Sequence, residues 1–349
     1  MSDDYRFLKA ARRESVDATP IWLMRQAGRY MAEYRALREK HSMLEVINTP
    51  ELATEVTLQP INAFDLDAAI IFADILPILI GMGLDLEFVP GKGPQLNNPI
   101  RSAEDVTALA TPSAQDNVPG TLAAISMVRE ELNGRVPLIG FSGAPFTLAS
   151  YAIEGGGSKN YVDVKSFMWS EPRAWQLLME KLTHVVTDYL IRQIEAGAQA
   201  VQIFDSWAGI LSPGDYQRNV LHFNVRVAKA VARMGVPVIY FGTNMNGMLD
   251  LVSTIPVDVY GVDSGVPIDV AWNQLGGPDK VAVQGNIDPI VLHAPWNVVQ
   301  QHVDDVLRRV GGRPGHIFNL GHGIHKETPV DNVKRLCEYV HEQTEVEPA

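Results

Sequence analysis

Short apolar runs that are rich in β-branched residues alternate with longer amphipathic segments along most of this chain. Runs of this kind, apolar throughout and separated by helices, predict a parallel sheet that is covered on both faces. Because about seven or eight such units follow one another, the pattern favours an α/β fold closed into a (β/α)8 TIM barrel over an open sheet. The predicted strands are Ala68–Phe72, Pro137–Phe141, Ala200–Phe204, Pro237–Phe241, Val257–Val262, Val281–Gln284 and His316–Leu320.

Helix signals lie between these runs. Trp175–Ala196 carries apolar residues at helical spacing, and Tyr216–Met234 is predicted as a further helix. Nearer the N-terminus, Thr49 is predicted to cap a helix that has Pro50 at its first position and ends near residue 63.

The domain organisation follows from what the sequence lacks. A length of 349 residues gives a prior of about two domains, but the chain has no internal repeat and no obvious linker. No Gly-x-Gly-x-x-Gly motif follows the first predicted strand, and Gly91–Gly93 is too short for one and is predicted as a turn. We therefore expect a single domain over residues 1–349, with the N-terminal segment 1–65 folding over the barrel mouth.

Charge and cysteine content exclude several classes of protein. The formal net charge of -12 argues against a nucleic-acid partner, since binding a phosphate backbone needs a basic surface. Cys337 is the single cysteine, which excludes intrachain disulfides and multi-cysteine metal sites. No apolar run reaches the roughly 18 residues of a membrane span. The first residues, Met1–Tyr5, do not resemble a signal peptide, so we expect a cytoplasmic protein without a membrane partner.

Polar or glycine-rich residues follow nearly every predicted strand. Barrel enzymes place their sites at the carboxyl ends of the strands, so these residues are expected to line one mouth. The mouth then offers carboxylate, hydroxyl, amide and imidazole groups, and it needs only cations to bind an acid. The residues after the strands are Asp74, Ser142–Gly143, Asp205–Ser206, Gly242–Asn244, Asp263–Ser264, Gly285–Asp288 and Gly321–Gly323.

Two arginines near the N-terminus can supply the cations. Arg25 and Arg29 stand four residues apart around the small pair Ala27–Gly28. On a helical turn this spacing puts both guanidinium groups on one face, and in an irregular turn the small pair lets backbone N–H groups approach a ligand. Arginine offers a fixed fork of donors that matches carboxylates and phosphates. The alternative is a surface turn whose arginines pair with nearby acidic residues.

Two longer motifs make the interpretation more specific. The segment Met24–Tyr30, which reads Met-Arg-Gln-Ala-Gly-Arg-Tyr, resembles the N-terminal signature of the uroporphyrinogen decarboxylase family. A second signature of that family resembles Gly140–Leu148 and continues through Tyr151 to Glu154–Ser158. The likeness runs over nearly the whole chain, with a departure at Ala32, where many members carry proline.

The resemblance implies a reaction and an assembly. It implies a barrel enzyme, a carboxy-lyase of haem biosynthesis, that removes CO₂ from the four acetate side chains of uroporphyrinogen III to give coproporphyrinogen III. Family members are homodimers whose two clefts face one another. No cofactor and no metal are implied, because protonating a pyrrole carbon creates the electron sink within the substrate.

Asp74 is the strongest single candidate for a functional residue in the sequence. It lies almost alone among apolar neighbours, where a charge is costly to bury without partners. From the residues alone, it either serves a ligand, caps the next helix or pairs with an internal arginine. The resemblance implies that Asp74 accepts hydrogen bonds from the pyrrole N–H groups and stabilises a cationic intermediate, an effect usually worth a few kcal/mol.

Each of the other expected site residues can likewise be interpreted as binding substrate or as serving the fold. By resemblance, Arg25 and Arg29 hold the acetate and propionate groups of the substrate. The remaining expected substrate-binding residues are Gln26, Ala27 and Gly28 in the arginine turn, together with Tyr151, Ser206 and His322. Without the resemblance, Tyr151 fits a core aromatic and Ser206 a helix cap, whereas two flanking glycines would give His322 room and exposure.

The proton donor and the rival functions stay open at this point. Arg25 is the family's candidate for proton donor, yet arginine ordinarily has a pKa above 12, so a bound water or a substrate carboxyl remains an alternative. The main rival is a corrinoid- or cobalamin-linked methyltransferase on a related barrel. Such enzymes bind zinc through several cysteines, and His322 and His325 lack a third ligand. A non-catalytic porphyrin-binding protein would keep the arginines but would not need Asp74.

Overall fold

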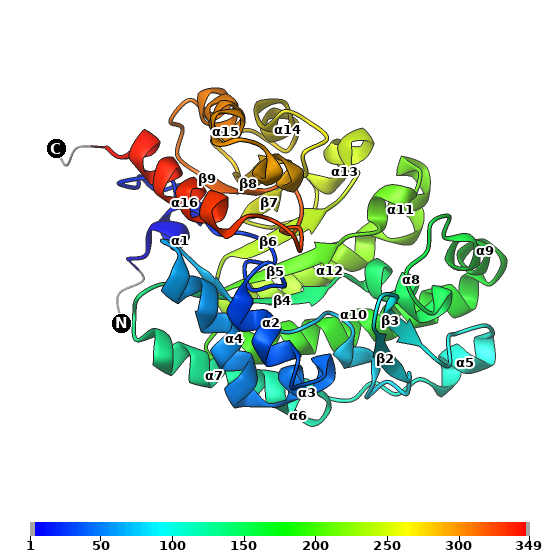
Figure 1. The fold of residues 1–349 in the computed structure, drawn as a ribbon. Coiled ribbons are helices and arrows are strands. Elements are labelled where there is room, and N and C mark those ends of the chain that lie inside the picture. Colours follow the sequence, from blue (N-terminus) through cyan, green and yellow to red (C-terminus); the bar gives the residue numbers. More distant parts are fainter. Residues whose placement is uncertain (1–3, 347–349) are drawn as a thin grey trace.

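The computed structural model describes residues 4–346 of the chain. Within them, seven parallel strands form one curled sheet in the order β1-β4-β5-β6-β7-β8-β9, with helices around its outside (Figure 1). The strands are β1 (Ala69–Ile70), β4 (Leu138–Gly143), β5 (Ala200–Asp205), β6 (Val238–Gly242), β7 (Val259–Gly261), β8 (Ala282–Ile287) and β9 (His316–Leu320). The parallel α/β barrel is therefore confirmed, and every predicted strand overlaps one of these seven.

A single bridge takes the place of an eighth strand in the described residues. Ile21 forms a parallel bridge with Phe318 of β9, and the N–H of Phe318 donates to the carbonyl of Pro20 at 2.8 Å. On its other side, the carbonyl of Ile21 accepts the N–H of Asp67, just before β1, also at 2.8 Å. The segment Pro20–Met24 thus fills the gap between the last and the first strand.

Helix α1 (Arg6–Ala11) closes the amino end of the barrel. Its Phe7 and Leu8 are buried in one cluster with Trp22 and with residues that begin the strands. Most strand residues of this cluster are alanine or β-branched, whereas the aromatic rings of Phe7 and Trp22 come from outside the sheet. The strand residues of the cluster include Ala68, Ile139, Ala200, Ile239, Val259, Ala282 and Ile317.

The remaining helices cover the outside of the sheet or follow the strand exits. They are α2 (Ala32–Arg38), α3 (Met43–Asn48), α4 (Pro50–Ala63), α5 (Ala103–Ala108), α6 (Ala114–Asn117), α7 (Pro119–Leu132), α8 (Pro145–Glu154), α9 (Val162–Ser170), α10 (Pro172–Glu195), α11 (Pro213–Asn219), α12 (Leu221–Val231), α13 (Leu249–Val252), α14 (Ile268–Gln274), α15 (Trp296–Val310) and α16 (Val330–Thr344), with short 3-10 turns η1 (Pro77–Leu79), η2 (Ala208–Ile210), η3 (Ala232–Met234), η4 (Asn246–Met248) and η5 (Pro289–His293). The C-terminal helix α16 lies on the same side as α1 (Figure 1).

One predicted helix is divided in the structure, and another, from Pro50 to Ala63, is confirmed with Thr49 at its cap position. The predicted helix Tyr216–Met234 is divided into α11, α12 and η3, because Val220 leaves the helical region with φ -132° and ψ -49°. Thr49 stands at the cap position of α4, but its side chain makes no capping hydrogen bond. The helix starts there because Pro50 occupies its first turn, where a missing N–H costs nothing.

A small hairpin lies outside the barrel. Strands β2 (Leu86–Val89) and β3 (Gly93–Leu96) pair antiparallel, and the predicted turn at Gly91–Gly93 connects them. These two strands were not predicted, because glycine and proline interrupt the apolar pattern. Within residues 4–346, no helix is both long enough and apolar enough to span a membrane.

Candidate active site

The arginine turn is attached to the exit of β9. The N–H of Met24 donates to Oδ1 of Asn319 at 3.1 Å, and the carbonyl of Met24 accepts the N–H of Ile324 at 2.9 Å. Arg25 then adopts a left-handed backbone with φ +62°, which is uncommon for a residue with a side chain. These bonds bring the exposed side chain of Arg25 to the carboxyl ends of the strands.

Gln26 connects the same turn to β1. Its side chain is 1% exposed, accepts the N–H of Leu23 at 3.1 Å and donates to the carbonyl of Ala68 at 3.1 Å. The backbone N–H of Gln26 is also engaged, because it donates to the carbonyl of Leu23 at 2.9 Å. Gln26 therefore acts within the fold as a brace between the turn and the strand that carries Asp74.

Three successive N–H groups follow Gln26. Within residues 4–346, those of Ala27, Gly28 and Arg29 have no hydrogen-bond partner. A Cβ atom on Gly28 would lie 3.1 Å from the carbonyl oxygen of Arg25, so the turn is tight at this point. Successive unpaired N–H groups in a turn form a concave site that suits an anion.

Asp74 lies four residues after β1 and keeps part of its surface exposed. Its Oδ1 accepts the N–H of Leu76 at 3.0 Å, just before the turn η1. No ion pair of Asp74 is found among the described residues. Burial raises the pKa of its carboxyl, while the N–H of Leu76 and the positive charge of Arg25 act in the opposite direction. This local bond does not cap η1, whose N-cap residue is Leu76, and it leaves the carboxylate with room for another donor.

Tyr151, on α8, lies within electrostatic reach of both Asp74 and Arg25. Burial raises the pKa of its phenol to about 12, the charge of Asp74 adds to this, and Trp207 and Arg25 oppose it. The hydroxyl is thus protonated at neutral pH and able to donate a hydrogen bond. The ring packs edge-on against Trp207, with centroids 5.8 Å apart.

His322 stands at the exit of β9 beside Arg25. Its Nδ1 accepts the N–H of Gly323 at 2.7 Å, so the neutral ring carries its proton on Nε2. Burial lowers the pKa of His322, Arg25 lowers it further and Asp263 opposes the shift. The imidazole is therefore neutral at pH 7, and its Nε2–H can donate to a carboxylate.

His322 is exposed, as its flanking glycines led us to expect, and these glycines also let neighbouring segments come close. A Cβ on Gly321 would lie 2.3 Å from the backbone nitrogen of Ser264, and one on Gly323 would lie 2.4 Å from Cδ of Arg25. Both glycines are needed because neighbouring segments approach them closely. They hold the β9 exit against the β7 exit on one side and against Arg25 on the other.

Asp205, which precedes Ser206, was expected to line the mouth, but the structure buries it inside the fold. Asp205 is fully buried and accepts hydrogen bonds from Thr147 at 2.9 Å, Asn224 at 2.8 Å and Tyr240 at 2.7 Å. Burial raises the pKa of Asp205, while these three hydrogen bonds lower it. The carbonyl of Ser206 in turn accepts the hydroxyl of Thr243 at 2.5 Å. The sequence does show an aspartate at the end of an apolar strand. It does not show the hydrogen-bond partners of this aspartate, because they lie on three other elements.

Thr57 of α4 is a further supporting residue that the sequence did not indicate. Its hydroxyl donates to the carbonyl of Ala53 at 2.7 Å and accepts the N–H of Phe72 at 2.9 Å. It thereby fixes the chain two residues before Asp74. A threonine inside a helix carries no signal of such a contact, because its partner is distant in sequence.

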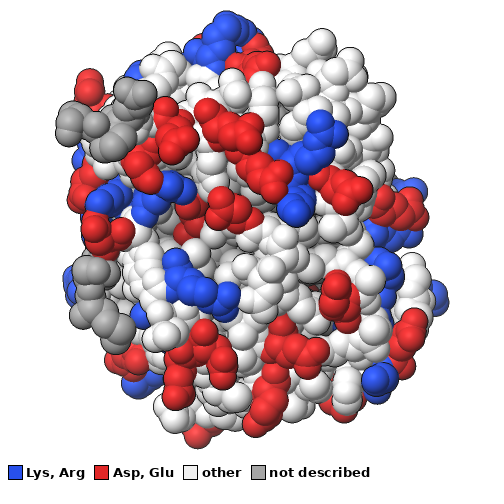
Figure 2. Space-filling view, turned by 60° about the vertical axis from the view of Figure 1, so that its left-hand side comes forward, with Lys and Arg blue, Asp and Glu red and all other residues white. Residues whose placement is uncertain are grey.

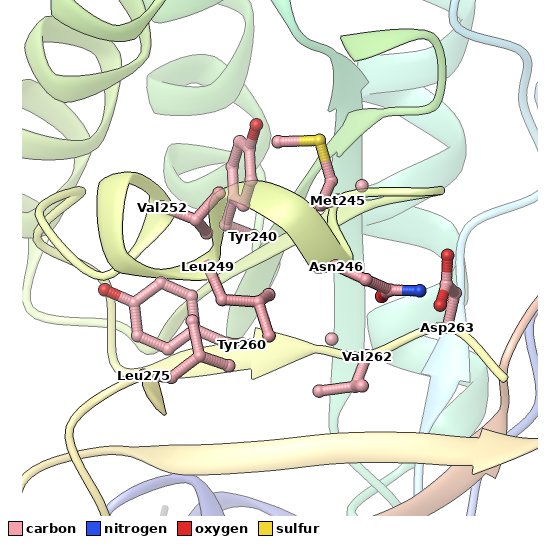
Figure 3. A pocket seen from close by; sticks show the side chains of 11 residues that line it. Tyr240, Met245, Asn246, Leu249, Val252, Tyr260, Val262, Asp263 and Leu275 are labelled. Carbon is pink, nitrogen blue, oxygen red and sulfur yellow. The ribbon is translucent and has the colours of Figure 1, made fainter. Parts of the chain in front are cut away.

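Two hollows of the molecule lie away from the groups that surround Arg25. One, of about 10 Å³, is lined mostly by apolar side chains behind the exits of β6 and β7, with Asn246 and Asp263 at one end (Figure 3). It has the volume of about one water molecule. The other, of about 470 Å³, lies beside α1 and is lined by paired charges such as Arg6 and Asp17. Neither contains Asp74, Tyr151 or His322.

The sequence matches a known protein family over almost its whole length. The model of the family described as uroporphyrinogen decarboxylase (URO-D) matches residues 2–343 of the chain. This chain belongs to the uroporphyrinogen decarboxylase family. A relative of that name from Roseiflexus sp. (strain RS-1) is 58% identical over 342 residues, which cover 97% of this chain and 98% of the relative. Another, from Carboxydothermus hydrogenoformans, is 55% identical and covers 96% and 95% of the two chains.

Solved structures confirm the fold at lower identity. A methyltransferase from Methanosarcina mazei superposes with a TM-score of 0.77 at 21% identity and covers 97% of both chains. A putative vitamin-B12 independent methionine synthase from Listeria monocytogenes gives 0.58 at 10% identity, covering 95% and 97%. These likenesses show a shared barrel, whereas the family match separates this chain from the methyltransferase alternative. The single cysteine, Cys337, is buried in α16.

Proposed function

We propose that this chain is a decarboxylase that converts uroporphyrinogen III into coproporphyrinogen III by removing CO₂ from its four acetate side chains. Membership of the uroporphyrinogen decarboxylase family supports the substrate class. The observation that carries the mechanism is Asp74, a partly buried carboxylate at the barrel mouth. Its carboxylate accepts the backbone N–H of Leu76, and Arg25 and Tyr151 lie within electrostatic reach of it.

The proposed reaction uses the substrate's own ring as the electron sink. A proton added to a pyrrole carbon gives a cation. The bond between the acetate methylene and its carboxylate then breaks, CO₂ leaves, and the electron pair neutralises the ring. A proton added to the resulting exocyclic methylene, with loss of the first proton from the ring carbon, gives the methyl group. No net oxidant, reductant or metal enters this balance.

Asp74 stabilises the cation in this scheme. A carboxylate held in place by the N–H of Leu76 needs no reorganisation when positive charge develops on the ring. Its free lone pairs accept the pyrrole N–H groups. Because the cation exists only after protonation, Asp74 contributes more to the rate than to the affinity for substrate.

The substrate's carboxylates are assigned to the donors around Asp74. Arg25 and Arg29 supply guanidinium groups, and the arginine turn adds the free N–H groups of Ala27 and Gly28. We assign the Tyr151 phenol, the Ser206 hydroxyl and Nε2 of His322 as the neutral donors, as the family resemblance implies. Gln26 takes a bracing role, because its polar groups already have partners.

The catalytic role of Arg25 is to orient the acetate that is lost. The positive charge of Arg25 lowers the pKa of both Asp74 and His322, so its guanidinium is within electrostatic reach of both side chains. We assign the proton itself to a bound water or to a carboxyl of the substrate, because a guanidinium gives up a proton very poorly at neutral pH.

The wider setting of the protein is part of the proposal. We propose a cytoplasmic homodimer that needs no cofactor, as the family resemblance implies. The net charge of -12 supports the absence of a nucleic-acid partner, and acidic and basic side chains are interspersed on the face shown in Figure 2. Of the segment 1–65, we place Arg25–Arg29 at the mouth, because hydrogen bonds attach this turn to the exit of β9.

Turnover separates this proposal from its alternatives. The purified protein would be incubated with anaerobically reduced uroporphyrinogen III in the presence of a chelator, and the oxidised products separated by carboxyl number. We expect products with seven to four carboxyl groups and their near absence with Asp74→Ala. Binding without loss of CO₂ would favour the non-catalytic porphyrin-binding protein, and an active Asp74→Ala would contradict the mechanism.

A further inference from the structure

The side chain of Arg25 lies along Gly323. A Cβ atom at Gly323 would be 2.4 Å from Cδ, 2.7 Å from Cγ and 3.0 Å from Nε of Arg25. Real Cβ atoms essentially never approach a heavy atom within 3.0 Å, so a methyl group and this side-chain position are incompatible. Three consecutive atoms are involved, which means that the arginine runs across the glycine instead of touching it with its tip.

The backbone of Arg25 is poorly placed to give way. Its φ of +62° is confined to a small allowed region. The preceding Met24 is bonded through both its N–H and its carbonyl, and the following Gln26 is braced by its side chain. A clash at Gly323 therefore has to be relieved by a change of side-chain rotamer. Turning the guanidinium alone leaves Cγ and Cδ where they are.

The β9 exit has a similarly fixed backbone. Gly323 donates its N–H to Nδ1 of His322, and the next residue, Ile324, donates to Met24. The φ of Gly323 lies outside the left-handed region, so alanine is compatible with its backbone. The methyl group itself is then the main consequence of replacing this glycine by alanine.

We propose that Gly323 is a positioning residue that sets where the guanidinium of Arg25 stands relative to Asp74 and His322. This proposal rests on the proposed function in assigning Arg25 to a substrate carboxylate. The missing Cβ creates a groove across the β9 exit, and the aliphatic part of Arg25 occupies it. The same loop thereby supplies one donor, His322, and fixes the position of another.

The test uses Gly323→Ala with a matched control. At Gly247 a Cβ atom meets nothing within 4 Å, and its φ is also outside the left-handed region, so Gly247→Ala controls for the substitution itself. We expect Gly323→Ala to raise KM for uroporphyrinogen III about tenfold or more, the size of effect that loss of one charged hydrogen bond gives. Gly247→Ala should match the wild type, and the melting temperatures of all three should agree.

A double-mutant cycle decides whether the effect passes through Arg25. In an Arg25→Ala background, Gly323→Ala should cause no further loss, because the side chain that it displaces is gone. An equal loss with and without Arg25 would overturn the proposal, as would wild-type kinetics of Gly323→Ala.

Binding of uroporphyrin, an octacarboxylate, followed by fluorescence, gives a readout that needs no turnover. Suppose that the wild type does not release CO₂, but Gly323→Ala weakens uroporphyrin binding only when Arg25 is present. The proposed function then fails, and the role of Gly323 stands. Suppose instead that turnover occurs, but the effect of Gly323→Ala does not depend on Arg25 in either KM or the dissociation constant. The role of Gly323 then fails, and the proposed function stands.

Discussion

Two aspartates near the strand exits differ in their surroundings. Asp205 is fully buried and accepts three side-chain hydrogen bonds, so its requirements are met inside the fold. Asp74 keeps exposed surface and accepts one backbone bond at 3.0 Å. A carboxylate with unfilled lone pairs facing an opening is suited to a ligand, whereas one that is saturated and buried holds its own elements together.

Replacing Asp205 by leucine should therefore damage the fold. The change removes the shared acceptor of Thr147, Asn224 and Tyr240 and leaves buried donors without a partner. We expect the free energy of unfolding to fall by about 3 kcal/mol or more, measured by urea denaturation. Glu55→Gln, at an exposed carboxylate of α4, serves as control. Unchanged stability of Asp205→Leu would show that the buried hydrogen bonds contribute nothing net.

Replacing Arg29 by alanine should affect substrate binding. Arg29 is exposed at the turn and is assigned to a substrate carboxylate, and a charged hydrogen bond contributes about 1.5–3 kcal/mol. We expect KM for uroporphyrinogen III to rise about 10- to 100-fold with little change in kcat. Arg233→Ala, at an exposed arginine near the amino end of β6, controls for the loss of one positive charge. Equal KM values for the two variants would remove Arg29 from the site.

At the scale of elements, helix α4 determines where β1 ends. The predicted strand Ala68–Phe72 is shortened to Ala69–Ile70, because the N–H of Phe72 turns to the hydroxyl of Thr57 instead of a neighbouring strand. The chain then leaves the sheet and carries Asp74 to the mouth. The last strand, in contrast, keeps its predicted bounds His316–Leu320, since its apolar run is paired along its length.

Thr57→Val tests this connection between α4 and the site. Valine has the shape of threonine but no acceptor for the N–H of Phe72, which should lower the free energy of unfolding by about 1–3 kcal/mol. We also expect kcat to fall, because the segment that leads to Asp74 loses its anchor. Thr57→Ser keeps the oxygen and should retain kcat. If valine and serine gave the same kcat, the helix would not position the site.

The sequence could predict those parts of the fold and site that depend on local pattern. Apolar runs located the strands of the barrel, and residues after them located Asp74, Ser206 and His322. It could not predict the hairpin β2–β3, whose strands contain glycine and proline, or the partners of Asp205. The contact of Arg25 with Gly323 joins residues some 300 positions apart, and no spacing along the chain encodes such a contact.

At the scale of the whole molecule, a buried histidine makes the fold sensitive to acid. His316 begins β9, is 3% exposed and contacts the carbonyl of Gly285 through Nε2 at 3.0 Å. Burial lowers its pKa from 6.5 to about 4. Between these values the unfolded chain binds more protons than the folded one, so the contribution of His316 to stability is lost as the pH falls from 6.5 towards 4.

His316→Gln should remove that part of the pH dependence. Glutamine can still donate to the carbonyl of Gly285 but does not titrate. Between pH 6.5 and 4 the wild type should lose roughly 3 kcal/mol more stability than the variant, measured by urea denaturation at each pH. His302→Gln, at an exposed histidine of α15, should follow the wild type. Parallel curves for wild type and His316→Gln would contradict the assignment.

The central claim is that Asp74 stabilises the transition state through its charge. Asp74→Asn keeps the shape of the side chain and removes that charge, so the most direct measurement is its dissociation constant and single-turnover rate with uroporphyrinogen III, side by side with the wild type. We predict a rate constant about 100- to 1,000-fold lower, with a dissociation constant within a few-fold of the wild type. A rate constant near that of the wild type, or a loss confined to binding, would contradict the account.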